Sequence, residues 1–145
     1  PYIQDLLKVS NAGTVEIGLT GQYQTDSTKI PAPVLKVNGQ AYSVLYAQPN
    51  NNLTFDWNES NIQTVTALTG AHTFTPTNPK IGATYIITLA QTGAVTPNWN
   101  SLVKWPAATA PTLTGAGKTD IITLICYNET GAGLYYGTST LDFTT

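Results

Sequence analysis

The residues that could do acid–base or nucleophilic chemistry are few in this chain, and they are scattered. It holds one histidine, His72, one cysteine, Cys126, and eight acidic residues. General acid–base catalysis needs two carboxylates near each other, or a histidine whose pKa is tuned by its surroundings. The acids form no such motif, although Asp56 lies between two aromatic residues and Asp120 opens an apolar run. We interpret both as acceptors of backbone N–H bonds at strand ends, with a glycan-cleaving pair as the alternative.

The single cysteine excludes further kinds of site. One Cys cannot form an intrachain disulfide or a cysteine-rich zinc site. Cys126 lies inside the apolar run from Ile121 to Tyr127, which predicts a small buried hydrophobe rather than a reactive thiol. The sequence also has no phosphate loop, dinucleotide fingerprint or metal-ligand spacing. We therefore expect no catalytic residue, no cofactor and no metal site.

Composition favours a neutral, rigid surface protein. The 145 residues suit one ordinary domain, and 41% hydrophobic residues can form a core. Only 10% of residues are charged, against about a quarter in typical domains. The chain has no arginine, its six lysines are dispersed, and its net charge is -2, which argues against nucleic-acid binding. No run approaches the roughly 20 apolar residues of a membrane helix, so we expect no membrane insertion.

A start at Pro1 suits either a trimmed complete protein or the end of a longer one.

The elements that must position these residues are predicted to be strands. Short runs rich in Val, Ile, Thr and Tyr are separated by Gly, Pro and Asn, with one helical turn expected at residues 2–8. The expected strands lie at residues 14–19, 34–37, 40–46, 53–57, 61–68, 72–75, 84–91, 120–127, 134–137 and 141–143. Roughly nine or ten strands at this spacing predict an all-β fold, an antiparallel β-sandwich or jelly-roll-like domain. The run from Asp120 to Tyr127 is apolar on both faces, which predicts cover by a second sheet and by a neighbouring subunit.

Two regions are expected along the chain. Residues 1–50 form a β-rich attachment segment whose hairpin turns at Asn38-Gly39, because this pair suits a type I′ turn. Residues 51–145 form the sandwich, a fibre or knob type of domain. One continuous domain over residues 1–145 is the alternative.

Aromatic residues are the most promising contact groups, because they combine a large apolar face with a polar atom. Trp99 and Asn98 lie in a polar loop and are the candidate surface or ligand contacts. The candidates for the core or for a subunit interface are Trp57, Trp105, Ile121, Leu124 and Tyr135.

An ordered series of short blocks runs through the last two thirds of the chain. The most specific block joins Val103-Lys104-Trp105-Pro106 to Thr109–Thr114 and then to Lys118–Ile121. The other blocks are Phe55-Asp56-Trp57, Gln63–Gly70, Pro79–Tyr85 with the strand ending at Gln91, and Tyr135-Tyr136-Gly137. Together, from Phe55 to about Tyr136, they resemble a β-rich domain of tailed-bacteriophage fibre and virion-surface proteins, of the tail-fibre, head-fibre or decoration type. The chain departs from that pattern at Ala107-Ala108, where the family often carries glycines, and this predicts an altered turn.

The resemblance implies a non-enzymatic virion protein, often trimeric, on the surface of a head or tail. We expect a fibre or knob subunit that contributes to host attachment through repeated weak contacts. Its expected partners are two further copies of itself, other virion proteins of the capsid or tail, and a host cell-surface glycan. One alternative is a capsid decoration (cement) protein that stabilises the head. Another is a carbohydrate-binding module or glycan-degrading enzyme.

Overall fold

The computed structural model describes residues 7–9, 15–17, 42–49, 51–93, 95 and 97–144. The chain divides into two compact units, Pro1–Ala41 and Tyr42–Thr145. In the first unit, β1 (Leu7–Val9) pairs antiparallel with β2 (Val15–Ile17). The predicted strand at residues 14–19 is thus present, whereas the helical turn predicted at residues 2–8 is wrong at its end, which belongs to β1. The rest of that turn and the Asn38-Gly39 hairpin lie outside the described residues.

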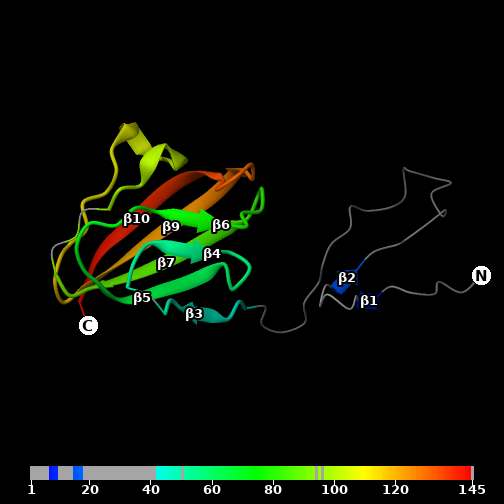
Figure 1. The fold of residues 1–145 in the computed structure, drawn as a ribbon, viewed down its shortest axis with the longest axis horizontal. Coiled ribbons are helices and arrows are strands. Elements are labelled where there is room, and N and C mark those ends of the chain that lie inside the picture. Colours follow the sequence, from blue (N-terminus) through cyan, green and yellow to red (C-terminus); the bar gives the residue numbers. More distant parts are fainter. Residues whose placement is uncertain are drawn as a thin grey trace, which may run out of the picture. The chain divides into compact units, whose positions relative to one another are not determined.

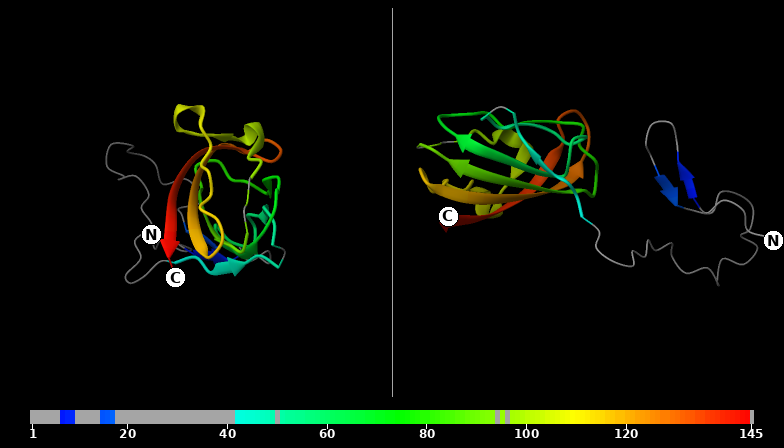
Figure 2. Two further views of the ribbon diagram at one scale, coloured as in Figure 1. Left: turned by 90° about the vertical axis from the view of Figure 1, so that its left-hand side faces the viewer. Right: turned by 90° about the horizontal axis from the view of Figure 1, so that it is seen from below.

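The second unit consists of two sheets. A six-stranded sheet has the strand order β3-β5-β7-β9-β10-β8, and a two-stranded sheet pairs β4 with β6 (Figures 1 and 2). The strands are β3 (Leu45–Ala47), β4 (Thr54–Asp56), β5 (Ile62–Leu68), β6 (Thr75–Thr77), β7 (Thr84–Gln91), β8 (Val103–Lys104), β9 (Lys118–Asn128) and β10 (Leu134–Thr144). Two single-turn 3-10 helices are also present, at Asn100–Leu102 and Pro106–Ala108. Within the described ranges, no helix is long and apolar enough to span a membrane. The all-β prediction is confirmed.

The expectation of purely antiparallel pairing is wrong. β3, β5 and β7 are mutually parallel neighbours, β4 is parallel to β6, and β8 is parallel to β10. From β3 to β7 successive strands alternate between the two sheets, so strands of the same sheet run in one direction. Among the described residues of this unit, only β7–β9 and β9–β10 pair antiparallel. The turn signals in the sequence were correct, but each early turn sends the chain across to the other sheet rather than back along a hairpin.

Side-chain alternation explains why these segments form strands. Along β7 the residues Tyr85, Ile87 and Leu89 are buried, while Ile86 and Thr88 between them are partly exposed. Successive side chains of a strand point to opposite faces, and β-branched residues suit that pleated surface.

β5 alternates less cleanly, and the structure gives the reason. Its register against β7 shifts between Val65 and Leu68, so a bulge lets both of these residues face inward despite their odd spacing. Gln63 is also fully buried, and its amide donates to the carbonyls of Asp56 and Ser60 at 2.6 and 2.8 Å. The polar side chain is therefore part of the fold and joins β5 to the end of β4.

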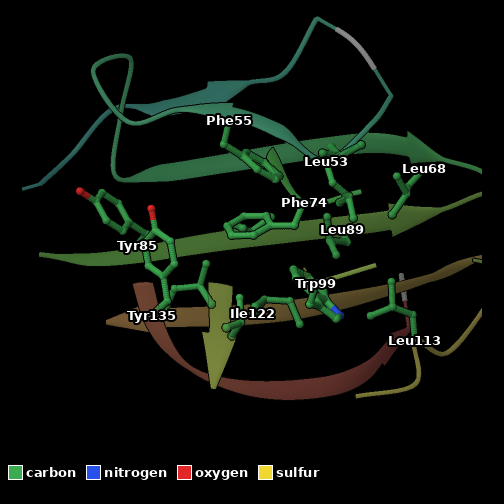
Figure 3. Packing of buried hydrophobic residues seen from close by; sticks show 14 of the residues in the cluster. Leu53, Phe55, Leu68, Phe74, Tyr85, Leu89, Trp99, Leu113, Ile122 and Tyr135 are labelled. Carbon is green, nitrogen blue, oxygen red and sulfur yellow. The ribbon is translucent and has the colours of Figure 1, made fainter. Parts of the chain in front are cut away.

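The core lies between the two sheets and is built around aromatic rings (Figure 3). Neighbouring rings lie 4.0–6.0 Å apart between centroids along the series Tyr85, Trp57, Phe55, Phe74, Trp99 and Trp105. Offset and tilted arrangements at these distances stabilise a core beyond the burial of area alone. β9 contributes Ile122 and Leu124, both fully buried, to the same core.

Candidate functional site

A long connection between β8 and β9 forms the most unusual local structure of the second unit. We call residues 105–117 the strap; it is the yellow segment in Figure 1. The strap is secured near its middle by Leu113, which is buried in the core. At its start, Trp105 packs against the core and closely approaches Gly137 of β10. The strap coincides with the block that carried the family resemblance most specifically.

Asp120 fixes the end of the strap. The side chain is fully buried, and its two oxygens accept four hydrogen bonds. Oδ1 accepts from the hydroxyl of Thr114 at 2.8 Å and from the backbone N–H of Asp142 at 2.9 Å. Oδ2 accepts from the backbone N–H of Thr114 at 2.8 Å and from the amide of Gln91 at 2.6 Å. The interpretation of Asp120 as an acceptor of backbone N–H bonds is confirmed.

Burial alone raises the pKa of Asp120, but its hydrogen bonds with Asp142, Thr114 and Gln91 outweigh that effect and lower the pKa below its ordinary value. Gln91 also receives the N–H of Gly115 on its side-chain oxygen at 2.7 Å. The buried carboxylate and amide thus hold β7, β9, β10 and the strap together.

A cavity of about 290 Å³ lies where the strap meets β10. It is lined by Trp105, Pro106, Thr109, Pro111, Thr138 and Ser139. The lining combines apolar rings with three hydroxyl groups and holds no charged side chain. The indole N–H of Trp105 is buried without an acceptor among the residues described.

The turn beside this cavity is strained. Ala107 and Ala108 have φ angles of 51° and 56°, in the left-handed region that L-residues other than glycine avoid. The cost is of order 1–2 kcal/mol per residue. These are the two positions where the sequence predicts an altered turn. Strained non-glycine residues persist where the surrounding structure fixes them, and they cluster at functional sites.

Gly137 sets how closely Trp105 approaches β10. A Cβ atom there would lie 2.6 Å from Cγ1 of Val103 and 2.7 Å from Cζ3 of Trp105. We expect Gly137→Ala to lower the free energy of unfolding by about 2 kcal/mol, because overpacking forces side chains from their rotamers. Urea unfolding followed by tryptophan fluorescence measures this. Gly93→Ala is the matched control, since nothing lies within 4 Å of its added Cβ, and an equal loss in both variants contradicts the prediction.

The structure places the expected surface contacts differently. Trp99 is only 3% exposed and packs between Phe74 and Trp105, so the expected exposure of this side chain is wrong. The reason is that the loop pairs with the 72–74 segment: the N–H of Phe74 donates to the Asn98 carbonyl, which directs the next side chain inward. Asn98 itself is exposed, and its side chain caps the N–H of Asn100.

The candidates for core or interface divide into two groups. Trp57, Leu124 and Tyr135 are buried, and the Trp57 indole donates to the Tyr135 hydroxyl at 3.1 Å. Burial raises the pKa of Tyr135 well above its ordinary value, so this phenol stays protonated and donates to the Ala132 carbonyl. Trp105 and Ile121 are only partly buried.

Ile121 belongs to the face of the six-stranded sheet that points away from the core, which we call the outer face. Cross-strand partners there form two rows across β5, β7, β9 and β10. The first row is Ile62, Ile86, Thr123 and Thr138, and the second is Thr64, Thr88, Ile121 and Thr140. None of these residues is charged.

The outer face also carries exposed aromatic and aliphatic groups. Tyr136 is 57% exposed and stacks on Tyr127, with ring centroids 4.3 Å apart. Ile125, which pairs with Tyr136 across β9 and β10, is 49% exposed. Leu45 of β3 extends the apolar surface to the other edge of the sheet, next to Ile62.

The remaining titratable groups have local partners. Asp56 accepts from the N–H of Asn58 and from the amide of Asn78 on a single oxygen, and both bonds lower its pKa. Cys126 is buried, and burial raises the pKa of its thiol. His72 hydrogen-bonds the Thr69 carbonyl. In the part of the chain that the structure covers, no three His, Cys, Asp or Glu side chains gather to hold a metal ion.

Sequence reasoning missed the cavity and the two rows of the outer face. The cavity joins residues about 30 positions apart, and no local pattern pairs the strap with Thr138 and Ser139. The outer face had a signal, because β7 and β9 alternate Thr or Ile with buried residues, but its extent depends on strand order. Neither a family model, nor a curated protein, nor a solved structure matches this chain.

Proposed function

We propose that the chain is a structural subunit on the surface of a bacteriophage particle, a fibre or knob subunit that assembles as a homotrimer and contributes to host attachment. The observation that carries this proposal is the outer face: two uncharged rows of Ile and Thr residues across four strands, with Lys104 beside Tyr136 at the edge, on a sheet whose other face already forms the core. Contiguous apolar surface of this kind marks an interaction site.

A second copy of the chain is the occupant that fits the outer face. The two central rows of the outer face carry no charge, so in two copies they meet without like-charge repulsion and without a buried unpaired charge, which costs several kcal/mol. Burial of apolar area contributes about 25 cal/mol per Å², and a stable interface buries about 800 Å² on each partner. The number of copies, three, is inferred from the family resemblance. Closed symmetry ends the assembly at a defined size.

The part of the chain that resembles phage fibre proteins has structural roles here, which supports a structural function. Trp57 and Tyr135 form a buried hydrogen bond, and Trp105 opens the strap. Asp120 uses both oxygens to hold that strap in place. These residues serve the fold, and a non-enzymatic subunit is the function they favour.

Location on the particle tests this proposal. We expect a gold-labelled antibody against the chain to decorate the surface of particles of the phage that encodes it, and the purified chain to compete with adsorption. Label at capsomer junctions, with weaker heads and normal adsorption after deletion, identifies a cement protein instead. Particles without label contradict the proposal.

A further inference from the structure

We propose that the cavity between the strap and β10 is a binding subsite for one ring of a neutral saccharide. This deepens the proposed function, on which it rests, by naming the ligand class and the residues through which the particle contacts a cell surface.

The apolar part of the lining fits the faces of a sugar ring. Trp105, Pro106 and Pro111 contribute an indole and two pyrrolidine rings to the cavity. A pyranose presents C–H groups on its faces, and aromatic rings favour such contacts because their faces carry negative charge density.

The polar part of the lining fits the edge of a sugar ring. Thr109 and Ser139 are exposed and each carries a hydroxyl, which both donates and accepts hydrogen bonds, whereas the side chain of Thr138 belongs to the outer face. The hydroxyl of Thr109 already donates to the Ala107 carbonyl at 3.2 Å, so it remains an acceptor for a ligand. Sugar hydroxyls are matched partners for such groups because they also donate and accept.

The charge of the lining and the size of the cavity limit which ligands fit. None of the six lining residues is charged, whereas recognition of a carboxylate or phosphate relies on Arg or Lys. The lining therefore favours a neutral sugar over a sialic acid, a uronic acid or a phosphorylated sugar. A volume of about 290 Å³ is at the lower end of the range for ligand pockets, which suits one ring rather than a long oligosaccharide.

Weak binding at one such subsite is useful only when it is repeated. A dissociation constant of about 1 mM or weaker is the expectation for one ring with few hydrogen bonds. Several copies on one particle convert such contacts into firm attachment, because each further contact forms at high effective concentration.

The test is a titration of the ¹⁵N-labelled full chain, followed by two-dimensional NMR, with methyl glycosides of glucose, galactose, rhamnose and N-acetylglucosamine. We expect at least one of these neutral sugars to shift the Trp105 indole resonance and the amides of Thr109, Thr138 and Ser139 in a saturable way. Ser139→Ala removes one hydroxyl from the lining, and we expect it to weaken binding about two- to tenfold. Ser101→Ala, at an exposed serine outside the cavity, is the matched control and should bind as the parent does.

A second variant, Ser139→Trp, fills the cavity and should abolish the shifts while its spectrum stays dispersed as in a folded protein. The proposal is overturned if no glycoside shifts the lining resonances at concentrations well above the millimolar range. It is also overturned if Ser139→Ala and Ser101→Ala bind alike, or if only a proline-rich peptide produces the shifts. Sedimentation of the same samples tests the assembly separately from the saccharide subsite. A monomer that binds sugar supports the subsite and contradicts the trimer. A trimer that binds no sugar supports the assembly and contradicts the subsite.

Discussion

Asp120→Asn is expected to lower the free energy of unfolding by about 3 kcal/mol, one of the two largest effects that the structure predicts. Each oxygen of Asp120 accepts two hydrogen bonds. An amide NH₂ in place of Oδ2 leaves the N–H groups of Thr114 and Gln91 facing another donor, and in place of Oδ1 it leaves the N–H of Asp142 so, because the Thr114 hydroxyl can rotate to accept. Buried donors left without a partner cost about 1–3 kcal/mol each, and bonds to a charged group are stronger than neutral ones. Chemical denaturation at neutral pH measures the loss.

Asp56→Asn is the matched control for that experiment. Asp56 accepts both of its hydrogen bonds on one oxygen, which the asparagine carbonyl can reproduce. We expect a loss of about 0.5 kcal/mol or less. Comparable losses in the two variants contradict the role assigned to Asp120.

The difference in stability between the parent and Asp120→Asn depends on pH with a definite sign. The pKa of Asp120 is lower in the folded than in the unfolded chain, so folding favours the ionised form. Its contribution is complete above the unfolded pKa of about 3.9 and is lost as the pH falls through the folded pKa. The difference in stability between the parent and Asp120→Asn should therefore shrink below about pH 4. A difference that grows on acidification contradicts the assignment.

Thr88→Lys is expected to disrupt the assembly while it leaves the fold intact. Thr88 lies on β7 in the second row of the outer face, between Thr64 and Ile121. Its side chain is partly exposed in the single subunit, so a lysine there reaches water. In an assembly the same ammonium groups are buried or brought together, and an unpaired buried charge costs several kcal/mol. We expect at least a hundredfold weaker association, measured by size-exclusion chromatography with light scattering.

The control for Thr88→Lys adds the same charge elsewhere. Thr54 lies on β4, in the two-stranded sheet, and is exposed there. Thr54→Lys should assemble as the parent does. Dissociation of both variants, or of neither, contradicts the assignment of the outer face as the interface.

The long strands were predictable because each has a local signal, whereas β8 was not predicted and β1 was expected to be part of a helical turn. Alternating β-branched and aromatic residues place β7 at residues 84–91 as predicted, and the apolar run at residues 120–127 is the middle of β9. Asp120 was also predictable, since its position at the start of an apolar strand favours backbone N–H partners. These inferences depend only on neighbours along the chain.

The strand order and the exposure of Trp99 were not predictable in the same way. A Gly- or Asn-rich turn ends a strand, but it does not say whether the next strand pairs beside it or crosses to the other sheet, which is what happens between β3 and β7. Trp99 sits in a polar segment, yet pairing of Asn98 with Phe74 turns its ring inward. Both outcomes depend on contacts between residues far apart in sequence.

The mass of the unmodified full chain in solution tests the central claim most directly. Sedimentation equilibrium over a wide range of protein concentrations should give three times the chain mass of 15.4 kDa, and the Thr88→Lys variant should give the single-chain mass. A folded parent that sediments at 15.4 kDa at every concentration contradicts the claim that the outer face is buried against further copies.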